Sequence, residues 1–146
     1  MGMYQQFGTD KNLEKSGIVI DYGDFRVTVA RAGSANSKFV RTHEFLTKPV
    51  RRLIDQDLLP VDKQQEINRA LYAKAVVLNW EVKETKGDKE TWKQGVEAAD
   101  GSVMPFNEEN VIATFENLPD LFFDLQIQAN TMKLFLASNR EADAKN

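Results

Sequence analysis

The sequence predicts an α+β fold that is mainly α-helical, in which an N-terminal β-hairpin packs on a bundle of about four to five helices. Strand-like alternation around one turn in residues 18–31 and apolar residues recurring every three or four positions further on support this prediction. The chain has 146 residues, of which 42% are hydrophobic and 28% charged, as is typical of globular proteins. We expect one domain (1–146), made of a hairpin region (8–32), a helical part (36–80), a polar surface excursion (81–104), a second helical part (105–138) and a frayed tail (139–146).

The stretch GIVIDYGDFRVTVARAG, residues 17–33, predicts the hairpin. Its strands, 18–21 and 25–31, are rich in β-branched and alternating residues, and Gly23 in the turn accepts a positive φ without steric cost. Phe25, Val27 and Val29 share one face of the second strand. An isolated hairpin is marginally stable, so we expect this face to pack on helices or on further strands.

Two main helices are predicted between residues 36 and 80. The first runs from about Ser37 to Thr47 after the capping candidate Asn36, and Pro49 suits the first turn of a further short helix. The sequence DKQQ from Asp62 resembles a capping box and opens a helix that ends near Trp80. Its run AVVL (75–78) is apolar on all sides, which predicts burial. The adjacent valines also allow a strand, but the helical spacing upstream favours the helix.

Residues 81–104 are charged, contain three glycines and show no long period. This composition predicts a surface excursion, in form a loose hairpin that carries Trp92. A helix is expected after it, capped by Asn107, with Glu108 and Glu109 in the first turn, where the positive end of the helix favours carboxylates.

The final helix, predicted over residues 118–137, is apolar on two sides. One stripe recurs at intervals of three and four and is typical of a buried face; its members are Leu118, Leu121, Phe122, Leu125, Ala129, Met132 and Leu136. Phe123, Ile127 and Leu134 lie about 140–180° from that stripe, at roughly 100° of turn per residue. Either the helix is sandwiched within its own domain, or these three residues form an exposed patch, which usually marks a protein contact. We name them as the candidate protein interface.

Composition excludes several functions. The chain has no cysteine, so it has no disulfide and no thiolate site, and this suits a reducing cytoplasm. The net charge of −3 disfavours a general binder of nucleic acid, and no apolar run is long enough for a membrane span. His43 is the only histidine, and there is no glycine-rich phosphate loop. We therefore expect no enzyme activity, no catalytic residues, no metal and no cofactor.

The opening block FGTDKNLEKSGIVIDYGDFRVTVARAG, together with ALYAKAVVLNW, LPDLFFDLQIQAN and the ending READAKN, resembles the tail assembly chaperones of long-tailed bacteriophages. The resemblance implies a mainly helical, non-enzymatic protein of the host cell cytoplasm that coats the tape measure protein during tail tube assembly and is absent from the finished virion. It implies the short form of a protein that is also made in a longer form by ribosomal frameshifting, with residues 139–146 at or near the frameshift region. The resemblance also implies that the longer form recruits the major tail protein, and we expect self-association of the chain.

Two alternatives remain beside this resemblance. A permanent virion subunit, such as a head–tail connector, would stay in the purified particle. A small nucleic-acid-binding regulator would use the basic cluster of Arg41, Lys48, Arg51 and Arg52. Charges on a helix face that pair with acidic neighbours or with a partner are the favoured explanation of this cluster.

Overall fold

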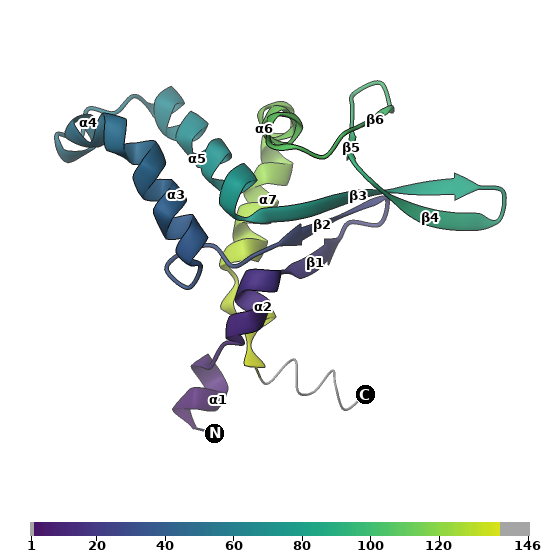
Figure 1. Ribbon diagram of the computed structural model, residues 1–146, viewed down its shortest axis with the longest axis horizontal. Coiled ribbons are helices and arrows are strands. Elements are labelled where there is room, and N and C mark those ends of the chain that lie inside the picture. Colours follow the sequence, from purple (N-terminus) through teal and green to yellow (C-terminus); the bar gives the residue numbers. More distant parts are fainter. Residues whose placement is uncertain (1, 138–146) are drawn as a thin grey trace.

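The computed structural model describes residues 2–137, so the predicted tail (139–146) and residue 138 of the second helical part lie outside the described residues. The fold is α+β and mainly helical, as the sequence predicts. In Figure 1, α3 and α5 lie side by side, and α7 crosses behind the sheet. The elements are α1 (Met3–Phe7), α2 (Lys11–Ser16), β1 (Ile18–Asp21), β2 (Phe25–Val29), α3 (Ser37–Thr47), η1 (Lys48–Val50), α4 (Arg51–Asp55), α5 (Val61–Ala75), β3 (Val77–Lys86), β4 (Lys89–Gln94), β5 (Val96–Glu97), β6 (Val103–Met104), α6 (Glu108–Asn117), α7 (Pro119–Asn130) and η2 (Met132–Phe135).

The predicted hairpin is confirmed and forms half of a four-stranded antiparallel sheet with the order β1-β2-β3-β4. Its turn closes through a 2.9 Å hydrogen bond from Tyr22 N to Phe25 O, and Gly23 has φ +94°. On the inner face, Val27 pairs with Trp80 of β3, and both side chains are buried. The hairpin is therefore stabilised by further strands as well as by helices.

The expectation that the helix from residue 62 continues to Trp80 is wrong. Helix α5 ends at Ala75, and β3 begins at Val77. The 2.8 Å hydrogen bond from Ala30 N to Val76 O joins the segment to the end of β2, and the β2–β3 ladder continues from there. Ala75, Val76 and Val77 are buried, as predicted, whereas Leu78 is exposed, contrary to the prediction. Pairing with β2 therefore overrides the helical spacing upstream.

The excursion predicted at residues 81–104 is more ordered than expected. The long β3–β4 hairpin occupies its first half, and β4 carries Trp92, as the hairpin interpretation predicts. Arg26 lies 4.2 Å from the centre of the Trp92 ring, and Lys83 lies 5.4 Å from it. Cation–π contacts of this kind attract the positive groups of Arg26 and Lys83 to the Trp92 ring. The second half forms the short β5–β6 ladder.

Local caps explain the helices that were predicted well. Asn36 accepts a hydrogen bond from Phe39 N at 3.2 Å and begins α3, and Asn107 caps α6 in the same way. The capping role expected of Asp62 is wrong, because Pro60 occupies the N-cap of α5 and makes no side-chain cap bond. The final helix is also shorter than expected, since α7 ends at Asn130 and a 3₁₀ turn, η2, follows.

The core lies between the inner face of the sheet and helices α5, α6 and α7. Its centre is aromatic: the rings of Phe115 and Phe122 stack at 4.4 Å between centroids, and Tyr72 meets Phe122 edge-on at 5.6 Å. Trp80 extends this group to the sheet, 6.3 Å from Phe115. One side of α7 is thus fixed in the core.

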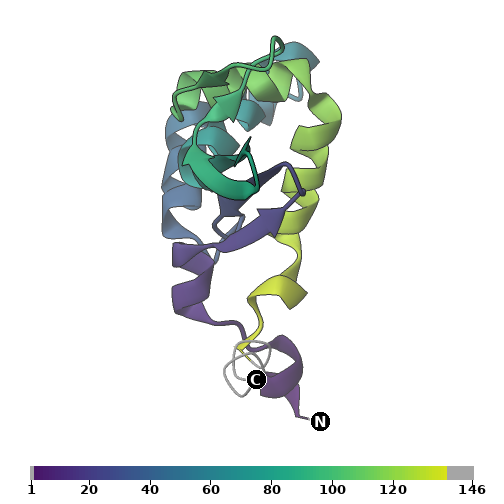
Figure 2. The ribbon, with the colours of Figure 1, turned by 90° about the vertical axis from the view of Figure 1, so that its right-hand side faces the viewer.

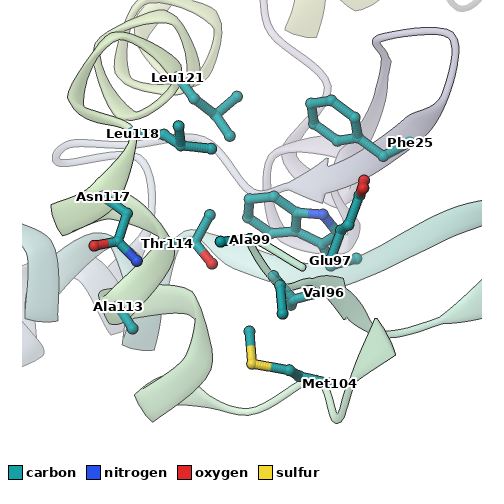
Figure 3. Close-up of a pocket in the computed structure, with 12 residues that line it drawn as sticks. Phe25, Val96, Glu97, Ala99, Met104, Ala113, Thr114, Asn117, Leu118 and Leu121 are labelled. Atoms are coloured by element: carbon teal, nitrogen blue, oxygen red, sulfur yellow. The ribbon is translucent and has the colours of Figure 1, made fainter. Parts of the chain in front are cut away.

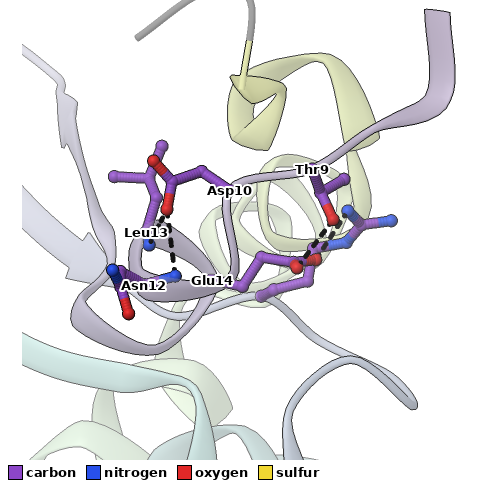
Figure 4. A network of polar contacts seen from close by, with 6 residues as sticks. Thr9, Asp10, Asn12, Leu13 and Glu14 are labelled. Carbon is purple, nitrogen blue, oxygen red and sulfur yellow. Dashed lines mark hydrogen bonds and ion pairs between the residues drawn. The ribbon is translucent and has the colours of Figure 1, made fainter. Parts of the chain in front are cut away.

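A polar network ties the N-terminal segment to the body of the protein (Figure 4). The Glu14 carboxylate is buried, accepts a 2.8 Å hydrogen bond from Thr9 Oγ1 and lies 3.3 Å from Nη1 of Arg31. Asp10 caps α2 by accepting from two backbone N–H groups of its first turn. The sequence prediction counted residues 8–16 with the hairpin region, and the structure corrects this, because Lys11–Ser16 form α2 after the cap at Asp10. The contacts of Glu14 with Arg31 join residues far apart in the chain and were not recognised.

Candidate functional site

Helix α7 presents apolar side chains on two opposite sides. Phe122, Leu125 and Ala129 are buried in the core, whereas Phe123 is 64% and Ile127 48% exposed. The alternative in which the helix is sandwiched within its own chain is therefore wrong, because the second stripe faces solvent. Its role as an interface stays a prediction.

Leu134 does not continue this stripe along the same helix. It lies on η2, beyond the end of α7, and is 36% exposed. The change from α-helix to 3₁₀ turn alters the rotation per residue, so the regular spacing that joined Leu134 to Phe123 and Ile127 in the sequence does not hold in space. The structure supports Phe123 and Ile127 as one surface and Leu134 as a separate exposed position.

Polar contacts on either side of the buried stripe fix the orientation of α7. The Tyr22 hydroxyl donates a 2.5 Å hydrogen bond to Asp124 Oδ2, which links the turn of the β1–β2 hairpin to the middle of the helix. Burial of the phenol, followed by this bond and the charge of Asp124, raises the pKa of Tyr22 above its ordinary value. Near the end of the helix, Asn130 Nδ2 donates to the Tyr72 hydroxyl at 3.0 Å. Phe123 and Ile127 are therefore held on a fixed element.

An apolar groove lies at the other end of α7, where Leu118 and Leu121 face the β5–β6 ladder (Figure 3). Its volume is about 470 Å³, within the range of ligand-sized clefts in proteins. The walls come from β2, β3, β5, β6, α6 and α7, and apolar side chains dominate them: Phe25, Trp80, Val96, Met104, Ala113, Leu118 and Leu121. Glu97 and Asn117 supply polar groups to the lining.

A glycine allows the chain before β5 to lie close against β6. Gly95, between β4 and β5, has φ +154°, and a Cβ placed there would lie 2.4 Å from Cγ1 of Val103. Only a residue without a side chain fits between the two short strands. The sequence analysis treated the glycines of this region as loop signals and missed the groove, because its lining residues come from six separate elements.

Two more surfaces outside the predicted site are apolar. Every residue of α1 is exposed, including Met3, Tyr4 and Phe7. A cleft of about 580 Å³ lies between α3, α5 and the segment joining α4 to α5, and the exposed apolar side chains of Ile54 and Val61 line it. His43 lines this cleft and is exposed. Apolar surface is therefore spread over several helices.

Groups that could carry chemistry are sparse in the part of the chain that the structure describes. Between residues 2 and 137, no three His, Cys, Asp or Glu side chains gather in a way that could hold a metal ion. Asp21 accepts a hydrogen bond from Gly23 N in the hairpin turn, and Glu108 and Glu109 occupy the first turn of α6. The four residues of the basic cluster are all exposed, on α3, η1 and α4. No helix within residues 2–137 combines the length and apolar character that crossing a bilayer demands.

Comparison with known proteins gives one family. The family described as YdaY prophage protein matches residues 34–146, which is more than three quarters of the chain. The matched part begins after the β1–β2 hairpin and includes α3, α5, the groove and α7. No curated protein and no solved structure matches the sequence.

Proposed function

Because the chain belongs to the YdaY prophage protein family and is therefore phage-derived, we propose that it is a tail assembly chaperone. In this proposal it binds and coats the tape measure protein while the tail tube assembles, and it is absent from the finished virion. It acts in the host cell cytoplasm without catalysis, metal or cofactor. A longer form made by ribosomal frameshifting recruits the major tail protein.

The observation that carries the proposal is the outer stripe of α7. Phe123 and Ile127 are large, apolar and exposed, on a helix whose opposite side is fixed in an aromatic core. Large apolar side chains that are exposed in this way lower the solubility of a protein. When they are grouped on one face, they usually mark a contact with another protein. A helix held on both sides by Tyr22 and Tyr72 offers that contact without first having to fold.

An exposed apolar stripe on α7 suits the task of such a chaperone. A tape measure protein is a long helical chain whose apolar stripes have no partner until the tube surrounds it, so it is prone to aggregate. A chaperone must cover these stripes and later be displaced by tube subunits. Two exposed side chains per copy give a weak contact, while many copies along one rod give a high combined affinity.

Co-expression with the tape measure protein tests the proposal. The chain is produced untagged from its native coding region, so that any frameshifted product is also made, together with a tagged tape measure protein. We expect the tape measure protein to become soluble and to retain many copies of the chain through purification. A tape measure protein that stays insoluble, with no chain bound to it, would refute the proposal.

A matched pair of variants locates the contact. Phe123→Ser with Ile127→Ser removes the outer stripe of α7 and should abolish co-purification while the chain stays folded. Phe45→Ser with Val40→Ser removes a comparably exposed aromatic and aliphatic pair from α3 and should leave co-purification intact. If co-purification falls equally in both variants, the loss is not specific to the α7 stripe, and the stripe is not the binding surface.

The rival functions have separate tests. A permanent connector subunit would be found by mass spectrometry of purified virions, where we expect the chain to be absent. A nucleic-acid-binding regulator would bind DNA through Arg41, Lys48, Arg51 and Arg52 with an affinity that falls steeply as salt rises. We expect no DNA binding even at low salt.

A further inference from the structure

A row of carboxylates lies beside the apolar stripe on the outer side of α7. Asp120 precedes Phe123 by three residues, and Asp124 precedes Ile127 by three. Residues at this spacing are neighbours on a helix surface, and so are Phe123 and Ile127, which are four apart. Around the axis, at roughly 100° per residue, both carboxylates fall on the same flank of the stripe. The outer side of α7 therefore presents two parallel rows, one apolar and one acidic.

The acidic row belongs to a long segment without positive side chains. Residues 94–132 contain seven carboxylates and no lysine, arginine or histidine, so their formal charge is −7 in a chain whose total is −3. The seven are Glu97, Asp100, Glu108, Glu109, Glu116, Asp120 and Asp124. Glu116 meets Arg69 of α5, whose Nε lies 3.8 Å from Oε1 of Glu116, whereas Asp120 is exposed in the first turn of α7. The electrostatic potential along the outer stripe is therefore negative.

A negative potential beside apolar side chains selects the chemistry of a partner. Anionic lipid surfaces and nucleic acids are repelled by it. In a partner protein, lysines or arginines would face the carboxylates while apolar side chains cover Phe123 and Ile127. Such a partner meets little obstruction, because α7 runs down the right-hand edge of the molecule in Figure 2, with the sheet and the other helices to its left.

The backbone of α7 favours a helical partner over an extended one. The peptide groups inside α7 are already bonded within the helix, so an extended segment laid along it would find no backbone partners for its own N–H and C=O groups. A helix brings its backbone already bonded and makes the contact through side chains alone. The surface therefore suits a helix whose own apolar row has positive charges beside it.

We propose that the outer side of α7 binds a basic amphipathic helix, in which lysines or arginines flank an apolar stripe. The identification of that helix as a segment of the tape measure protein rests on the proposed function. Phe123 and Ile127 give a small contact that any apolar stripe could cover, and the carboxylate row restricts the contact to stripes with the opposite charge. The row thus selects which parts of a long client are covered.

Two labelled peptides test the proposal without the tape measure protein. Each has about twenty residues with leucines at intervals of three and four, long enough to form a helix on binding; one carries lysines beside this stripe and the other glutamates. Fluorescence polarisation should show the full chain binding the basic peptide more tightly than the acidic one. Phe123→Ser with Ile127→Ser leaves the charge unchanged and should abolish this binding. Failure of the basic peptide to bind, or undiminished binding to the double variant, would overturn the proposal.

A charge reversal with a matched control isolates the carboxylate row. Asp120→Lys should weaken binding of the basic peptide about five- to tenfold, because a repulsion replaces an attraction across the contact. Asp88→Lys makes the same change of charge at the exposed turn between β3 and β4 and should weaken it less than about twofold. Asp120→Lys should also bind the acidic peptide more tightly than the wild type does, a gain that unfolding cannot produce. Equal effects of the two reversals would contradict the proposal.

Co-purification with the tape measure protein separates this inference from the proposed function. If the tape measure protein binds the wild-type chain and Asp120→Lys equally well, the chaperone proposal stands and the basic helix is overturned. If the peptides behave as expected but the tape measure protein does not bind, the preference of α7 for a basic helix stands and the client is a different protein.

Discussion

Two adjacent phenylalanines on α7 allow a sharp test of how this helix is placed. Phe122 and Phe123 are the same residue type in the same helix, but Phe122 is 9% exposed and Phe123 is 64% exposed. Replacing each with alanine changes the helix propensity equally, because both sites lie in the interior of α7. Any difference between the two variants therefore reports burial.

The structure sets the size of the difference. Burying a phenylalanine side chain contributes about 1.5–3 kcal/mol, and each aromatic pair adds about 0.5–1.5 kcal/mol. Phe122 makes two such pairs, at 4.4 Å with Phe115 and at 5.6 Å with Tyr72. We expect Phe122→Ala to lower the free energy of unfolding by about 3–5 kcal/mol. Phe123→Ala should change it by no more than about 0.5 kcal/mol, as at other surface positions.

Urea unfolding followed by tryptophan fluorescence measures both values. With an m-value of about 2 kcal/mol/M, the midpoint for Phe122→Ala should fall by roughly 2 M urea while that for Phe123→Ala stays near the wild type. Because a domain of this kind has a total stability of about 5–15 kcal/mol, the Phe122→Ala protein can still fold in buffer. Co-purification with the tape measure protein should show the reverse order, with Phe123→Ala the more impaired. Equal destabilisation by the two substitutions would refute the placement of α7 described above.

Three further predictions concern polar contacts. Tyr22→Phe should lower stability by about 1–3 kcal/mol, since it leaves the part-buried Asp124 without its donor. The pKa of Tyr22 is raised in the folded protein, so the stability that the neutral phenol contributes is complete below about pH 10 and declines above it; Tyr22→Phe should flatten this decline in urea titrations. Asn36→Ala should cost about 2–3 kcal/mol in thermal unfolding, because the buried side chain caps α3 and also donates a 3.0 Å bond to the last residue of α5. Glu14→Gln should cost about 3–5 kcal/mol, because it leaves the Arg31 guanidinium beside an uncharged partner in a buried site; a cost below 1 kcal/mol would contradict the network of Figure 4.

The elements that sequence reasoning predicted correctly are those whose signals are local. Helices α3 and α6 begin where Asn36 and Asn107 cap them, and the first hairpin turns at Gly23, as the short-range pattern requires. Each of these signals involves residues only a few positions apart, so no knowledge of the tertiary fold was needed.

The errors arise where distant parts of the chain decide the conformation. Residues 76–80 are compatible with a helix or a strand, and pairing with β2, some fifty residues earlier, selects the strand. The outer stripe of Phe123 and Ile127 was recognisable from spacing alone, because one helix contains both residues. The groove was not, because the packing of β5 and β6 over α6 brings its walls together.

The two edge strands of the sheet, β1 and β4, affect how a protein with this much exposed apolar surface can associate. Within the described residues, β1 and β4 each pair with a neighbour on one side only, which leaves backbone groups that could recruit a strand from another chain. β1 has only four residues, and the outer strand β4 reads KETWKQ, with charges at Lys89, Glu90 and Lys93. Both features discourage edge-to-edge pairing, which leads toward cross-β aggregates. These edges therefore favour contacts with other chains at the helix surfaces, which run through side chains, over pairing between strands.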